Sequence, residues 1–126
     1  MDLELKYKSL VDSLRLLASS YEKQEDYLPK FVVVQDEVIS LFGDAFLIAP
    51  QLIEKDLLSN DAIASMIRCY NLMDMAIRNQ ETPNDFKIRE SWNKVRELAS
   101  LTLEKMNEEL KEPDLSFVDW VDYKQD

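Results

Sequence analysis

Apolar side chains recur every three or four residues along most of the chain, which is the spacing of one face of an α-helix. This recurrence runs through residues 2–24, 29–45, 60–80 and 83–112. The three consecutive valines at 32–34 would be typical of a strand, but no second run of this kind offers a pairing partner. The pattern therefore predicts an all-α fold, a bundle of about four main helices.

Capping residues and prolines indicate where these helices begin. Asp2 suits the start of the first helix, and Ser59 or Asn60 suits the start of the third, because their side-chain oxygens accept hydrogen bonds from free amides of a first turn. Pro29 and Pro83 fit the first turns of the second and fourth helices, where no amide donor is needed.

The most apolar stretch, residues 28–53, contains the only glycine of the chain, Gly43. Glycine costs about 1 kcal/mol inside a helix, so Gly43 is expected to end or bend the second helix. Pro50 is then expected to open a short helix that reaches about Lys55. Acidic side chains stand among the apolar ones here, so one side of the stretch should be buried while its acids face water or a partner.

The last fourteen residues follow Pro113, which is expected to stop the fourth helix. Their aromatic density is unlike that of a disordered tail. We expect this tail to dock on the bundle, either as an intramolecular clasp or as a partner interface. Six large apolar residues are available for such contacts: Leu115, Phe117, Val118, Trp120, Val121 and Tyr123.

Length and charge narrow the function classes. A chain of 126 residues is most simply one domain over 1–126, and its net charge of −10 argues against nucleic-acid and anionic-membrane binding. The charge suits a basic protein partner, or it serves only to keep the protein soluble. A single cysteine, a charged N-terminus and the lack of a long apolar run favour a cytoplasmic location.

Candidate catalytic chemistry is sparse. The chain has no histidine, which removes histidine-based triads, histidine-liganded zinc and most di-iron bundle sites. The adjacent acids Asp36 and Glu37 diverge on a helix and make a poor catalytic pair. Cys69 is expected to be a buried, inert thiol, and Trp92 to be core rather than a surface partner of Arg96. We therefore expect no enzyme activity, no cofactor and no metal.

Acids gather in two segments that also carry apolar residues. Residues 29–60 hold five acids and two bases, and residues 113–126 hold four acids and one base. These segments are either a recognition face for a basic partner or a solvated edge. With two aromatic tail residues added as interface anchors, the predicted partner-binding set is Asp36, Glu37, Asp44, Glu54, Asp56, Asp114, Asp119, Trp120, Asp122 and Tyr123.

Three stretches, FVVVQDEVISLFGDAF, PQLI and ESWNKVRELA, together under a third of the chain, resemble a class of small, acidic, all-helical bacterial proteins. Some members of that class are similar to immunity proteins of toxin–immunity pairs. The resemblance implies an inhibitor that binds one cognate toxin, often a basic nuclease, and occludes its active site. It implies no binding residues, and a helical adaptor or regulatory protein is the alternative.

Overall fold

A computed structural model describes residues 2–120 of the chain, and its regular structure over that range is entirely helical. Four long helices and two short ones follow one another, which confirms the predicted all-α class and the four main helices. They are α1 (Leu3–Ala18), α2 (Tyr21–Tyr27), α3 (Val34–Glu54), α4 (Asn60–Arg78), α5 (Asp85–Ile88) and α6 (Glu90–Lys105).

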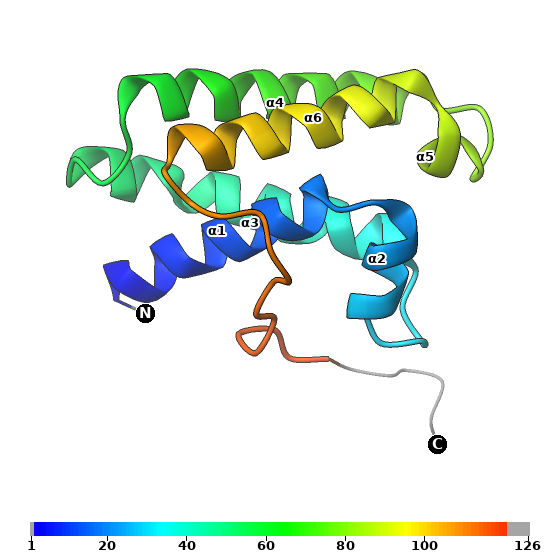
Figure 1. Cartoon of the computed structure of the whole chain (residues 1–126), viewed down its shortest axis with the longest axis horizontal. Helices are drawn as coiled ribbons and strands as arrows, with labels where there is room; N and C mark the ends of the chain where they lie inside the picture. Colours follow the sequence, from blue (N-terminus) through cyan, green and yellow to red (C-terminus); the bar gives the residue numbers. More distant parts are fainter. Residues whose placement is uncertain (1, 121–126) are drawn as a thin grey trace.

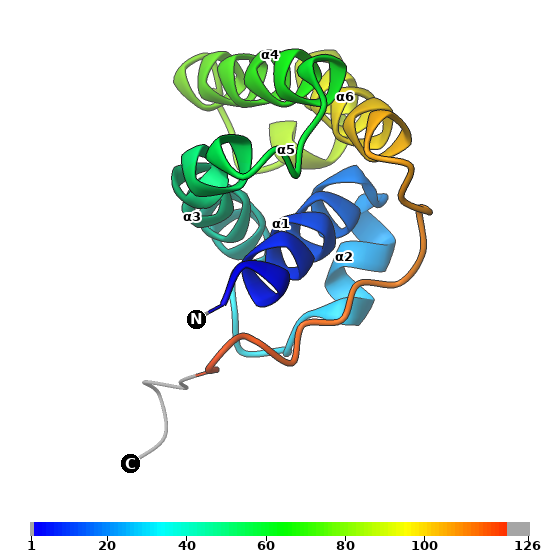
Figure 2. The same cartoon turned by 90° about the vertical axis from the view of Figure 1, so that its left-hand side faces the viewer.

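The four long helices form two stacked pairs (Figures 1 and 2). One pair is α4 with α6 and the other is α1 with α3, while α1 also packs against α6 and joins the pairs. The short helices α2 and α5 lie at the same end of the bundle, where the rings of Tyr21 and Phe86 meet edge to face at 6.0 Å.

The core lies between the two pairs and uses the apolar stripe of every long helix. Trp92 and Phe42 are its largest fully buried side chains. Each fully buried side chain of this size contributes about 1.5–3 kcal/mol. Other members with at most 3% exposure include Leu10, Leu14, Leu17, Val38, Leu52, Met66, Met73, Val95, Ala99 and Leu103.

Residues 2–24 do not form the single helix that was predicted. Helix α1 ends at Ala18, and Ser20 caps α2 by accepting a hydrogen bond from the Lys23 amide at 3.3 Å. The fully buried Gln24 donates from its side-chain amide to the backbone oxygen of Leu16 at 3.0 Å. The same amide group also donates to the Leu17 carbonyl at 3.4 Å, so a buried side chain binds two carbonyls at the end of α1 and stabilises the interruption.

Helix α3 is one helix of 21 residues, where a helix broken near Gly43 and a separate short one were predicted. It begins at Val34, so Pro29 lies in the preceding connection rather than in a first turn. Both Gly43 and Pro50 sit inside it. Pro50 has no amide hydrogen to donate to the Phe46 carbonyl. Because Pro50 is exposed, water can reach this carbonyl instead. Burial of the α3 apolar stripe outweighs both local penalties.

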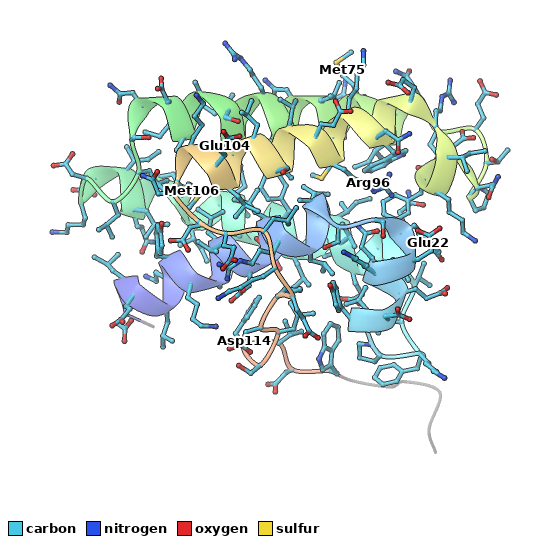
Figure 3. All side chains as sticks on the ribbon, in the orientation of Figure 1. Glu22, Met75, Arg96, Glu104, Met106 and Asp114 are labelled. Carbon is cyan, nitrogen blue, oxygen red and sulfur yellow. The ribbon has the colours of Figure 1, made fainter. Side chains whose placement is uncertain are left out.

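Helix α4 confirms its prediction closely. It runs from Asn60 to Arg78, and Ser59 Oγ accepts a hydrogen bond from the Ala62 amide at 3.1 Å. Cys69, Met66 and Met73 are buried, whereas Ile67 and Ile77, also expected on the apolar face, are 43% and 38% exposed. Met75 is 56% exposed and points away from the bundle (Figure 3).

The predicted helix 83–112 is divided and ends early. Arg89 is extended between α5 and α6, and Arg96 Nη2 donates to the Phe86 carbonyl at 2.7 Å, which would otherwise be buried without a partner. Helix α6 ends at Lys105, because Asn107 takes a positive φ of 58° and its neighbour Glu108 donates to the Leu103 carbonyl at 2.9 Å. This is the left-handed helix ending that Asn tolerates better than most residues.

Two apolar side chains of the predicted helix 83–112 lie outside α6. Ile88 is 67% exposed and Leu110 is 50% exposed, so neither belongs to the core. Trp92, in contrast, is fully buried as predicted, and the Arg96 guanidinium lies over the Phe86 ring at 4.9 Å rather than over Trp92.

Candidate protein interface

The described part of the tail docks on the bundle as predicted. After α6 the chain crosses α1 and continues along the side away from α4 and α6 (Figures 1 and 3). Pro113 is buried, and Leu115 and Trp120 pack against the core. Of the other predicted tail contacts, Phe117 is 40% exposed and Val118 is partly buried, whereas Val121 and Tyr123 lie outside the described residues.

A polar cluster on α1 holds the tail in place. Asp12 is fully buried, and its Oδ1 accepts hydrogen bonds from Arg15 Nη1 at 3.0 Å and from the Asp114 amide at 3.1 Å. Its Oδ2 accepts from Lys8 Nζ at 3.0 Å, and the same Nζ donates to Asp114 Oδ2 at 2.6 Å. One carboxylate of α1 therefore binds both the backbone and, through Lys8, the side chain of the tail.

Two further contacts extend this cluster towards the end of α6. Arg15 Nε donates to the Glu109 carbonyl at 2.9 Å, and Tyr7 donates its hydroxyl to Glu108 Oε2 at 2.9 Å. Burial, followed by the hydrogen bond to Glu108, raises the pKa of Tyr7 to about 12. We call Tyr7, Lys8, Asp12, Arg15, Glu108 and Asp114, with the backbone that they hold, the tail clasp.

An apolar depression borders the clasp where the tail passes α1 and α3. It has a volume of about 240 Å³ and a mostly apolar lining. A second depression of about 370 Å³ shares Ser9 and Phe117 with the first and adds Leu5, Lys8 and Asp114. We call the first depression the tail groove; its lining residues are Ser9, Leu41, Asp44, Ala45, Ile48, Phe117 and Val118.

The groove brings together residues from the two acidic segments, and Asp44 is the member of the predicted partner-binding set that lines it. Asp44 lines it from α3, and residues 117 and 118 line it from the tail. Glu37, Leu41, Asp44 and Ile48 succeed one another at spacings of four and three, so Glu37 lies on the same side of α3 as the groove. Acidic and apolar side chains are thus combined on one face.

Other predicted acids of α3 lie apart from the groove. Asp36 and Glu54 are exposed and lie at opposite ends of the helix, about 27 Å apart along its axis. Asp36 and Glu37 occupy the first turn of a helix that has no side-chain cap, so they also stabilise its positive end.

Two predicted acids have clear local roles. Asp56 takes a φ of 58°, and the neighbouring Leu57 amide donates to the Leu52 carbonyl at 3.0 Å, so this residue terminates α3. Asp114 belongs to the tail clasp, and its hydrogen bond with Lys8 is the main cause that lowers the pKa of its carboxyl.

Two of the remaining predicted tail residues lie within residues 2–120, and two do not. Asp119 is exposed, and Trp120 is partly buried against the core. Asp122 and Tyr123 lie outside the described residues. The predicted set is therefore not one continuous patch: Glu37, Asp44 and the tail groove form its most coherent part.

Two observations concern metal binding and thiol chemistry. Within residues 2–120, no group of three or more potential metal-ligating side chains is close enough to hold an ion. Burial raises the pKa of the Cys69 thiol to about 12, so the nucleophilic thiolate is disfavoured.

Comparison of the chain with models of protein families, with characterised proteins and with solved structures gave no match. Of the helices in residues 2–120, none combines the length and the apolar character needed to cross a membrane.

Proposed function

We propose that this protein is a non-enzymatic protein-binding module that inhibits a basic toxin domain, in the manner of an immunity protein or antitoxin. The observation that carries the proposal is the charge of α3. Its 21 residues include four acids and no base. No acid of α3 is in an ion pair with the described residues 2–120.

The arrangement supports binding in two stages. Unpaired acids on α3 attract a positively charged partner over a distance and raise the association rate. The apolar tail groove then removes partner side chains from water, which stabilises the complex after it has formed. A bundle docked over a basic active site would exclude the toxin's substrate by its bulk.

Binding kinetics test the proposal on the partner recovered from the native host. Substitution of Asp36, Glu37 and Asp44 by Asn or Gln should lower the association rate at least about 10-fold at low salt, with a smaller change in dissociation rate. Glu97 and Glu104 provide a control, because both are exposed acids of α6, away from α3 (Figure 3 labels Glu104). An association rate that does not change with salt concentration would reject the proposal that the acids of α3 attract the partner. An equal loss of association rate per removed charge in the α3 variants and in the α6 controls would reject it too.

A helical adaptor is the second candidate, and the apolar lining of the tail groove favours it. Such a groove can hold a partner without blocking an active site. The partner's own activity separates the two functions: a stoichiometric amount of this protein abolishes it in the inhibitor case and leaves it intact in the adaptor case.

A further inference from the structure

Gly43 has no role in the internal packing of this fold. It lies mid-helix in α3 with an ordinary negative φ, so the backbone does not require glycine. A Cβ atom built there would meet nothing within 4 Å, so no neighbour requires the space either. Glycine is nevertheless among the poorest helix formers. The position therefore faces outward, where glycine leaves the helix backbone accessible to another molecule.

Gly43 stands at the middle of a row of outward-facing side chains. We call this row, which follows spacings of three and four, the outer ridge of α3: Asp36, Ser40, Gly43, Leu47, Gln51 and Glu54. Leu47, one turn beyond Gly43, is 76% exposed, more than any other large apolar side chain of residues 2–120. A bare backbone beside a protruding leucine offers both a close approach and an apolar anchor.

The charges around the ridge select the kind of partner. Asp36, Glu37 and Asp44 surround its first half without a basic neighbour on the helix. Two cations lie at its other end, where Lys6 donates to Gln51 and Lys55 follows the last turn. A partner segment should therefore place lysine or arginine beside the first half of the ridge.

We propose that the outer ridge of α3 receives a basic amphipathic helix of the partner, which crosses α3 over Gly43 and covers Leu47. The distance between two packed helix axes depends on the side chains at the crossing, so glycine allows the partner helix to approach most closely there. This inference deepens the proposed function, since it specifies which surface of the protein-binding module is used and what it binds.

A fluorescein-labelled helical peptide of lysine, leucine and alanine, about 14 residues long, is a suitable probe because it would span roughly 20 Å. Fluorescence anisotropy should show binding to the full chain, and an analogue with glutamate in place of lysine should not bind. The single glycine also gives one isolated amide signal in a nitrogen–proton NMR spectrum. That signal and those of residues 40–51 should shift most on titration with the peptide.

Two variants test the crossing point. Gly43→Ala should raise the melting temperature by about 2–6 °C because alanine favours the helix, yet weaken peptide binding at least about 5-fold. Leu47→Ser should weaken binding at least about 10-fold by removing the apolar anchor. A purely structural role for Gly43 would not produce higher stability together with weaker binding.

Matched controls come from exposed positions elsewhere. Asn71→Ala on α4 gives a similar gain in helix propensity, and Ile88→Ser on α5 removes a side chain that is 67% exposed; both should bind the peptide as the parent does. Absence of peptide binding, equal binding by all four variants, or NMR shifts confined to the tail groove would overturn the inference. The inhibitor proposal would survive such a result if the salt-dependent kinetics with the recovered partner held.

Discussion

Removal of the Asp12 carboxylate should destabilise the protein far more than removal of a surface acid. In an Asp12→Ala variant, Arg15 Nη1 and the Asp114 amide lose their acceptor, and Lys8 Nζ loses one of its two acceptors. The Arg15 side chain is only 10% exposed, so water replaces that acceptor poorly, whereas the Lys8 side chain is 50% exposed and recovers much of its hydration.

The expected magnitude follows from these exposures. Breaking a buried ion pair from one side typically costs about 3–5 kcal/mol. Arg15 keeps its bond to the Glu109 carbonyl, which reduces the loss, while the unpaired Asp114 amide adds to it. We expect a decrease of about 3 kcal/mol in the free energy of unfolding, a large share of the roughly 5–15 kcal/mol of an ordinary domain.

Urea denaturation followed by circular dichroism measures this change, and the Asp74–Arg78 pair supplies the control. That pair has side chains 46% and 76% exposed, so Asp74→Ala should cost less than about 1 kcal/mol. If Asp12→Ala cost no more than Asp74→Ala, the clasp would contribute nothing beyond a surface ion pair. In a chain truncated after Glu112, Asp12→Ala should cost less, because Asp114 is then already absent.

Four further predictions follow from the described geometry. Truncation after Glu112 should lower the melting temperature clearly, because the tail residues packed on the core are lost. Asp56→Gly should raise stability by about 0.5–1 kcal/mol in thermal denaturation, since φ is 58° there. Cys69 should resist a thiol reagent at pH 8 until the protein unfolds. Hydrogen bonds, of which the one from the Glu81 amide has the largest effect, lower the pKa of the Asp85 carboxyl to about 2. Asp85→Asn should therefore lower the free energy of unfolding at neutral pH, and the stability difference between the variant and the parent should vanish as the pH falls towards 2. Urea denaturation across pH measures it.

The long helices were predictable because their information is local. Ser59 and the stripe after it define α4 within a few residues, and the interior stripes of the other long helices place Trp92 and Phe42 in the core. The breaks were not predictable in the same way. Gln24 donates to the Leu16 carbonyl beside one break, and Arg96 donates to the Phe86 carbonyl beside another; apolar spacing along the sequence does not reveal either contact.

The candidate site likewise has one part that was predictable from local sequence and another part that was not. Charge along the sequence indicated Glu37 and Asp44, and helical spacing alone places them on one side of α3. The tail clasp could not be foreseen, because Asp12 and Asp114 are 102 residues apart and Asp12 lies among polar positions of a helix whose apolar stripe is elsewhere. Leu47 was hidden for a different reason: inside an apolar run, sequence does not reveal which leucine faces water.

The separation between Asp12 and the tail also determines when this contact can form. Helices α1 and α3 pair over a short stretch of chain, whereas the clasp, like the contact of α1 with α6, joins segments far apart in the sequence at a higher entropic cost. During synthesis the Asp12 carboxylate therefore stays hydrated until Asp114 has emerged from the ribosome. In the finished protein the same contact should be the first to open, so the Asp114 amide should exchange its hydrogen with solvent by a local opening, well before the core amides of α6.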